Sequence, residues 1–269
     1  MQKNMCSQTL IDISISFKTK IFFVVLLAVI MGTDYWRVFS QGRFQRNVYD
    51  YISISTLPLN LFYVILPIFL LLLLVYFSAA KSYPNIQIRF QSRRSWFWTT
   101  VLSLFKLATA GTVTFFTLIV LYALPTFSFQ NHWSDFMKFE MNMDGSLYQK
   151  LALLNPFLFS LELFLLIICL LFTSSLIFLT LFILTRKPFI AFFICFVLSV
   201  INVGIHVGGV EQLYPLTFWS NVHPVEYNFA HHLDQTTLPI TPFFYWVALM
   251  VIFVFVGWFF VNRGDLELA

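Results

Sequence analysis

The sequence predicts an all-α integral membrane protein with six transmembrane helices, both termini cytoplasmic, a short amphipathic inner segment and a broken outer helix. Composition is the first reason: 59% of the 269 residues are apolar, 10% are charged, and Phe occurs 35 times. A soluble domain needs a more polar exterior than this composition offers. The second reason is that several apolar runs approach or exceed the roughly 20 residues with which a helix crosses a bilayer. The third is that Lys and Arg collect in alternate connections between the runs, as in multi-pass proteins.

The connection between the second and third apolar runs sets the orientation. Residues 81–98 read KSYPNIQIRFQSRRSWFW and contain four cations, with Trp96 and Trp98 at the end. Short loops rich in Lys and Arg remain on the cytoplasmic side, and Trp favours the headgroup level. We therefore expect this segment at the cytoplasmic face, and every other span takes its direction from it.

One transmembrane domain is expected to cover residues 1–269. Residues 1–17 alternate polar and apolar side chains, which is typical of an amphipathic segment on the inner surface. Pro67 predicts a kink in the second span because proline removes a backbone donor and clashes with the preceding turn. Asn155-Pro156 predicts a short interfacial helix that breaks before the fourth span. The expected spans are residues 21–36, 57–80, 98–124, 156–184, 189–207 and 242–261.

The charges of the connections support this order of spans. The predicted inner segments hold ten Lys and Arg against three acids, and the outer segments hold five against eight when Asp34, near the outer end of the first predicted span, is counted with them. The outer loop at residues 208–241 contains Glu211, Glu226 and Asp234 but no Lys or Arg. The first outer connection is an exception, since residues 37–56 carry three arginines. Because the cations cluster at the inner face, we expect them to meet anionic lipid headgroups and not nucleic acid.

Two ionisable residues fall inside predicted spans, where such residues are candidates for a substrate pathway. Lys106 lies eight residues past Trp98, about 12 Å from the inner boundary at 1.5 Å per residue, and Glu162 lies about 9 Å from the outer one. The two are too far apart in depth to pair. Lys106 can instead extend its own stem inwards, in the direction of the headgroups, and Glu162 can line a cavity near the outer mouth.

Histidines gather in and beside the last outer loop, at His206, His223, His231 and His232. Such residues can hold a transition metal, but no HxxxH or HExxH pair places two rings on one helical face. We therefore expect no metal site here; a solvated external loop is the preferred interpretation, with a pH-sensitive loop as an alternative. The three cysteines are scattered and form no CxxC pair, so neither a disulfide framework nor a zinc site is predicted.

Nucleotide chemistry is not expected in this chain, because it lacks a GxxxxGK[ST] phosphate-binding loop. The order of its features resembles that of the ABC-2 type permeases (type V exporters), the membrane subunits of bacterial ABC exporters. The shared features are the inner segment, six spans, the basic turn QSRRSWFW, a broken helix around NPF, a large external loop before the last span and the final NRGDLEL. The resemblance covers nearly the whole chain as an arrangement.

That resemblance implies a transporter subunit of the bacterial plasma membrane and not an enzyme in its own right. In the family, the turn between spans two and three docks on a separate ATPase subunit, which binds ATP and Mg. Here the residues in that place are Asn85, Arg89, Arg93 and Arg94. A second permease copy or homologue would complete the substrate pathway, to which Glu162 and Lys106 are assigned, for an amphiphilic peptide, lipid or antibiotic.

Two other classes of function stay open at the level of sequence. A membrane-embedded metal-dependent enzyme would use the external histidine loop and would carry stoichiometric metal. An accessory or sensor membrane protein would have no transport role, and it would tolerate neutralisation of the arginines in the basic turn.

Overall fold

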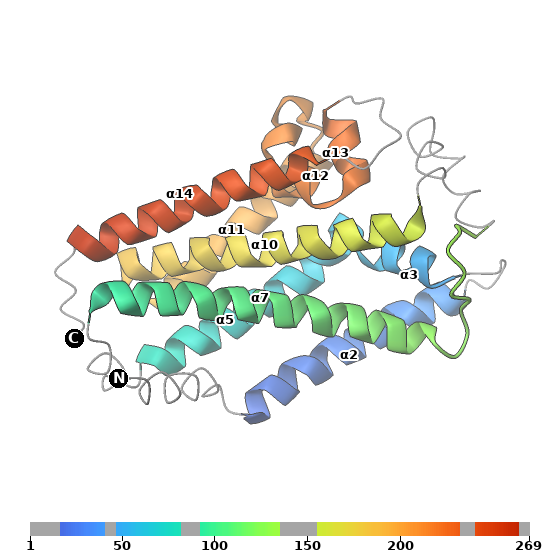
Figure 1. Ribbon diagram of the computed structural model, residues 1–269, viewed down its shortest axis with the longest axis horizontal. Coiled ribbons are helices and arrows are strands. Elements are labelled where there is room, and N and C mark those ends of the chain that lie inside the picture. Colours follow the sequence, from blue (N-terminus) through green and yellow to red (C-terminus); the bar gives the residue numbers. More distant parts are fainter. Residues whose placement is uncertain (1–16, 41–46, 82–91, 135–154, 232–239, 264–269) are drawn as a thin grey trace.

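Long helices lying side by side make up the body of the molecule (Figure 1). The computed structural model describes residues 17–40, 47–81, 92–134, 155–231 and 240–263. The long helices run alternately towards the two ends of the bundle (Figure 1). They are α2 (Phe17–Ser40), a continuous helical stretch of α4 (Pro58–Asn60), η1 (Leu61–Ile65) and α5 (Leu66–Lys81), α7 (Arg93–Ala123), α10 (Pro156–Thr185), α11 (Pro188–Val207) and α14 (Thr241–Arg263).

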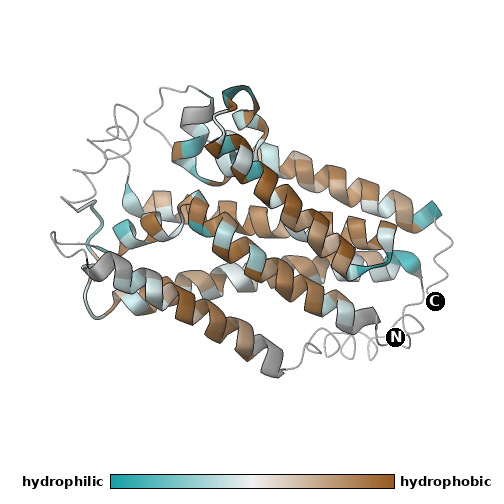
Figure 2. Cartoon of the chain, turned by 180° about the vertical axis from the view of Figure 1, so that it is seen from behind, coloured by the Kyte–Doolittle hydropathy of each residue, from teal (hydrophilic) through white to brown (hydrophobic). Residues whose placement is uncertain are grey.

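Among the described residues, five helices are long and apolar enough to cross a membrane. They begin at residues 58, 93, 156, 188 and 241, each within five residues of the predicted start. Figure 2 shows the apolar residues along the middle of these helices and polar residues towards their ends. The chain is therefore a multi-pass helical membrane protein. In α2 the apolar stretch covers only Ile21–Thr33, so a sixth span stays a prediction, as does the direction of the termini.

Helix α10 is the centre of the bundle, and it packs against α14, α7, α11 and α5. Most of its Ser and Thr hydroxyls donate to carbonyls of their own helix, as when Ser174 and Ser175 each donate to the carbonyl four residues earlier, at 2.8 Å. Small side chains of this kind let membrane helices approach closely. Gly257 of α14 faces this helix, and a Cβ there would lie 3.3 Å from Thr180 Oγ1. Close packing along α10 therefore holds the bundle together.

The start of α10 is fixed by the residues that the sequence singled out. The Asn155 side chain accepts hydrogen bonds from the amides of Phe157 (3.0 Å) and Leu158 (3.3 Å), and Pro156 occupies the first helical position. Proline costs nothing there because that amide has no partner in the helix. The predicted start of the fourth span is confirmed. The interfacial helix expected before it, like residues 1–16, lies outside the described residues.

Pro67 alters its helix in a specific way. Residues Leu61–Ile65 form a π-helical turn, and the Leu66 amide bonds to the carbonyl of Leu61, five residues back. Pro67 itself offers no amide to the carbonyl four residues earlier. We attribute the wider turn to this missing donor, because an extra residue in the turn relieves the clash with the ring. The irregularity expected from Pro67 is thus a π-helical turn just before it.

Tyrosines attach the C-terminal half of α2 to its neighbours. The Tyr122 hydroxyl donates to the Ala28 carbonyl at 2.8 Å, and the Tyr51 hydroxyl donates to the Met31 carbonyl at 3.3 Å. Tyr35 and Thr126 share a hydroxyl hydrogen bond of 2.7 Å. These bonds hold α2 firmly only towards the end of the bundle where it meets α3 (Val48–Ser55).

Short helices and buried polar groups close that same end. The Asn47 side chain caps α3 by accepting from the amides of Tyr49 and Asp50, and it donates to the carbonyls of Gln130 and His132. The Asp50 carboxylate accepts from the amides of Asn47 and Ser134, both at 3.3 Å. Between α11 and α14 the chain forms η2 (Glu211–Leu216), α12 (Phe218–Val222) and α13 (Pro224–Ala230).

Candidate functional site

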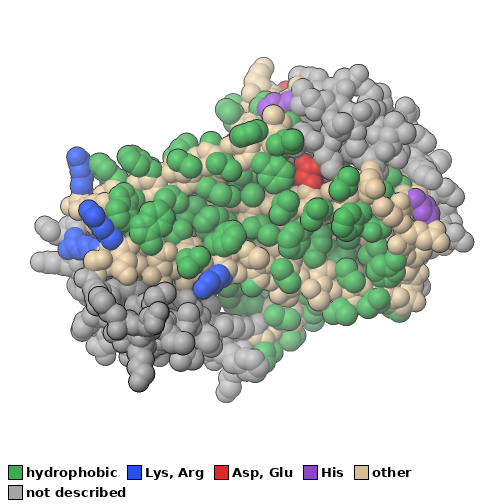
Figure 3. Space-filling view, in the orientation of Figure 1, with side chains coloured by type: hydrophobic (Ala, Val, Ile, Leu, Met, Phe, Trp, Pro, Cys, Tyr) green, Lys and Arg blue, Asp and Glu red, His purple; other side chains and the backbone are tan. Residues whose placement is uncertain are grey.

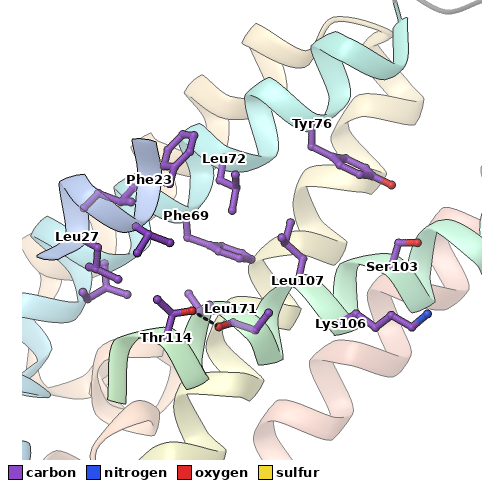
Figure 4. Close-up of a pocket in the computed structure, with 15 residues that line it drawn as sticks. Phe23, Leu27, Phe69, Leu72, Tyr76, Ser103, Lys106, Leu107, Thr114 and Leu171 are labelled. Atoms are coloured by element: carbon purple, nitrogen blue, oxygen red, sulfur yellow. Dashed lines mark hydrogen bonds between the residues drawn. The ribbon is translucent and has the colours of Figure 1, made fainter. Parts of the chain in front are cut away.

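An apolar groove of about 410 Å³ lies between α2, α5 and α7. Its size falls within the range of small-molecule binding sites, roughly 300 to 1,000 Å³. Apolar side chains supply most of its wall, including Phe23 and Leu27 of α2, Phe69 and Leu72 of α5 and Leu107 of α7. Figure 4 shows these side chains around the space.

Three of the four polar side chains of the groove lie towards one of its ends, and the fourth, Thr114, lies towards the other (Figure 4). Tyr76, Ser103 and Lys106 all belong to the lining, and Figure 4 shows their polar tips on the same side, away from Phe23 and Leu27. Lys106 is exposed. Because α5 ends at Lys81 and α7 begins at Arg93, this is the end nearer the basic connection. The groove is therefore amphipathic along its length.

Small residues on α7 leave the room for the groove. Ser103, Ala110, Gly111 and Thr114 line it on one face of that helix. At Gly111 an added Cβ would make only ordinary contacts, 3.7 Å from the Phe69 ring and 3.8 Å from Leu171. The sequence analysis did not detect this groove, although the spacing of those four small residues is a signal that could have indicated it.

The structure separates the two predicted pathway residues. Lys106 lines the groove, whereas Glu162 lies in the second turn of α10 and is not part of its lining. Glu162 is only 6% exposed, and neither carboxylate oxygen has a hydrogen-bond partner. A buried carboxyl group in this state is costly. The prediction that these two residues do not pair agrees with their places.

The predicted docking residues lie at the end of the bundle where Lys and Arg gather. Arg93 and Arg94 form the first turn of α7, behind the N-cap Ser92. The Arg94 guanidinium carbon lies 5.4 Å from the centre of the Trp258 ring, a distance typical of a cation–π contact. Figure 3 shows Lys and Arg side chains gathered towards this end of the visible face. Asn85 and Arg89 lie outside the described residues.

The histidine loop is not the solvated loop that the sequence suggested. His223 is 2% exposed, its ring meets the Phe159 ring at 5.6 Å, and neither nitrogen has a hydrogen-bond partner. Burial lowers the pKa of His223 to about 3. The expectation failed because the short helices α12 and α13 fold back over the bundle, which polar composition alone does not reveal.

His206 and Glu226 form a second contact in this layer. His206 Nε2 lies 3.4 Å from Glu226 Oε2, and the imidazole stacks on Trp219 with ring centres 4.6 Å apart. Burial raises the pKa of Glu226, and the nearby indole N–H of Trp219 opposes that rise without reaching hydrogen-bond geometry. Within the described ranges, no three His, Cys, Asp or Glu side chains come together as a metal site requires.

Comparison with known proteins gives similarity without a function. No family model matches the chain, and no solved structure matches it. Among curated proteins, the chain is similar to an uncharacterized protein of the bacterium Halalkalibacterium halodurans, 29% identical over 225 residues, which are 83% of this chain and 81% of that protein. A function therefore has to be argued from the helices, the groove and the charges.

Proposed function

We propose that the chain is the membrane-spanning subunit of an ATP-driven exporter, with six spans and both ends in the cytoplasm. Its substrate is amphiphilic, and a second copy or homologue completes the pathway. A separate ATPase subunit binds ATP and Mg, since the chain has no phosphate-binding loop of its own. The sequence resemblance to ABC-2 type permeases concerns the order of features along the chain. The arrangement of the helices in space now adds support to it.

The observation that carries the proposal is the position of the connection between α5 and α7. It leaves and re-enters the bundle at the end where α10 and α14 also end. The charged residues described at that end are cations, namely Arg93, Arg94, Arg186, Lys187 and Arg263. A cation-rich end belongs on the cytoplasmic side. These cations support a cytoplasmic position for the connection, where an ATPase could press on it.

Three further features support a transporter over a static anchor. The π-helical turn in the second predicted span (Leu61–Ile65) is the kind of local irregularity often found at functional sites in helices. The short helices η2, α12 and α13 occupy the loop before the last helix, where the resemblance has its large external loop. A groove of about 410 Å³ beside α7 gives an amphiphile a place to enter.

Co-purification with an ATPase tests the proposal. The tagged chain is extracted from its bacterial host in a mild detergent, ATP hydrolysis is measured, and co-purified proteins are searched for a GxxxxGK[ST] loop by mass spectrometry. The double variant Arg89→Ala/Arg93→Ala should lower the recovered ATPase by about tenfold, which corresponds to about 1.4 kcal/mol of lost binding. Arg94 is spared because it packs on Trp258.

The matched control removes the same charge from other positions at the same end. Lys187→Ala/Arg263→Ala should leave the recovered ATPase within about twofold of the wild type, since neither residue lies in the connection between α5 and α7. An equal loss of recovered ATPase in both double variants would mean that net charge alone causes the effect, and it would refute a docking site. Recovery of the chain with no ATPase, or with stoichiometric metal, would refute the exporter and favour the accessory or enzyme alternative.

A further inference from the structure

Lys106 presents a physical problem that its own side chain does not solve. It lies eight residues past Trp98 in α7, which places it about 12 Å from the predicted inner boundary at 1.5 Å per residue. A lysine can extend its four-carbon stem towards the headgroups, but from mid-helix that stem covers only part of the distance. An ammonium group at this depth needs a polar partner.

The described part of the groove around Lys106 offers this ammonium group no acidic partner. Among the described residues that line it, none is acidic. Ser103 and Tyr76 add neutral polar groups on the same side as the Lys106 ammonium group (Figure 4). The remaining wall is mostly apolar, from Phe23 to Leu72. The charge and shape of the groove therefore complement a molecule with one anionic head and an apolar tail.

We propose that this groove binds a single-chain amphiphile with an anionic head group, drawn from the inner leaflet of the membrane. The head lies at Lys106, and the chain lies between α2 and α5. Taking the roughly 30 Å³ share of one water molecule as the measure of a methylene group, about 410 Å³ holds about a dozen carbons. That volume is enough for one acyl chain.

Entry from the membrane follows from how α2 is attached. The hydrogen bonds described for α2 to other helices come from Tyr51 and Tyr122 to its carbonyls at Met31 and Ala28. The groove instead meets α2 at Phe23, Val24 and Leu27, closer to the start of that helix, where its described contacts are apolar. A chain can thus slide between α2 and α7 without breaking a described hydrogen bond. The binding of this amphiphile does not depend on the proposed function. Only the further claim that it is the transported substrate rests on that function.

Equilibrium binding without nucleotide tests the site. The full chain is placed in nanodiscs of phosphatidylcholine, and binding of radiolabelled dodecyl phosphate is measured after subtraction of empty nanodiscs. Binding should saturate at one molecule per chain. Lys106→Gln should weaken it by tenfold or more, because a charge-assisted hydrogen bond is lost, and Lys106→Arg should restore it to within about threefold.

A second pair of variants tests the space and not the charge. Gly111→Val places methyl groups towards Phe69 and Leu171 and should reduce binding by tenfold or more. Gly204→Val is the matched control, because a Cβ there meets nothing within 4 Å; it should bind as the wild type does. Melting temperatures and gel filtration show whether each variant is folded.

Three outcomes would overturn the site: unsaturable binding, equal binding of dodecyl phosphate by Lys106→Gln and wild type, or equal affinity for dodecyltrimethylammonium. Each of these outcomes would mean that the groove is an apolar crevice that lipids fill whatever the charge of their head group. Because no ATPase is present, a positive result here combined with failure to recover a partner would retain the binding site and reject the exporter.

Discussion

The two ends of the helix bundle differ in the exposure of their ionisable side chains. Towards the basic end, Lys106 stands exposed beside an open groove. At the other end, Glu162 and His223 are 6% and 2% exposed, without hydrogen-bond partners. The difference follows from packing: small residues on α7 leave space beside Lys106, while α3, α12 and α13 cover the buried groups of the other half. Binding is therefore expected in the open half, and control of stability in the packed half.

The largest effect is expected from the buried cap of α3. Asn47→Ala removes the acceptor for the amides of Tyr49 and Asp50 and the donor to two carbonyls. We expect a loss of about 2 to 4 kcal/mol in the free energy of unfolding, the cost of a lost cap and of buried groups left unpaired. Thermal unfolding in detergent measures it.

The exposed cap at the opposite end provides the contrast. Ser92 caps α7 by accepting from the Ser95 amide at 3.2 Å, and both residues are at least partly open to solvent. Ser92→Ala should cost only about 0.5 to 1 kcal/mol. Equal costs for the two caps would contradict the division into a packed half and an open half.

The pH dependence of stability should follow from His223. Its pKa is about 3 in the folded chain and 6.5 when unperturbed. At pH values between these two, the imidazole is protonated in the unfolded chain and neutral in the folded chain. Stability then rises with pH from 3 to 6.5 and is lost as pH falls through that window. At pH 5 the loss relative to pH 8 is about 2 kcal/mol.

The variant His223→Phe isolates that contribution. It keeps an aromatic contact with Phe159 and removes the titrating group. Glu226 acts in the opposite direction because burial raises its pKa, and it faces His206, but both stay in the variant and cancel in the comparison. Chemical unfolding at pH 5 and pH 8 measures the difference. The same loss of stability in His223→Phe as in the wild type would assign the effect to another group.

Glu162 should be a site where an apolar replacement stabilises the protein. Glu162→Met removes a buried carboxyl group whose oxygens have no partner and should raise the free energy of unfolding by about 1 to 2 kcal/mol. Glu162→Gln keeps a polar group in the same place and should give little or no gain. A destabilised Glu162→Met would mean that the carboxyl group has a stabilising partner in the membrane.

Two glycine variants should give the smallest effects and opposite signs. Gly111→Ala meets only ordinary contacts at 3.7 Å and should stabilise the helix by about 0.5 to 1 kcal/mol. At Gly32 an added Cβ would lie 3.0 Å from the Tyr122 hydroxyl oxygen, which bonds to the Ala28 carbonyl. Gly32→Ala should therefore leave the free energy of unfolding unchanged or lower it. A stabilising effect at both positions, measured by thermal unfolding, would mean that the outer half is looser than described.

The sequence predicted the helices better than it predicted the sites. The apolar runs, Asn155-Pro156 and Pro67 act locally, so the start of α10 and the irregular second span could be anticipated. The burial of His223 could not, because it depends on how α12 and α13 fold back over Phe159, a contact between residues far apart in the chain. The groove likewise needs three helices at once, although the small residues of α7 were visible in the sequence.

The most direct test of the central claim is whether a ligand in the open groove changes ATP hydrolysis by an ATPase bound at the basic connection. ATP hydrolysis by the complex of this chain with its co-purified ATPase is measured in nanodiscs as dodecyl phosphate is added. The account predicts stimulation in the wild type, and none in Lys106→Gln at the same concentration, while Gly204→Val responds like the wild type. Equal stimulation in Lys106→Gln and the wild type, or no hydrolysis in any complex, would contradict it.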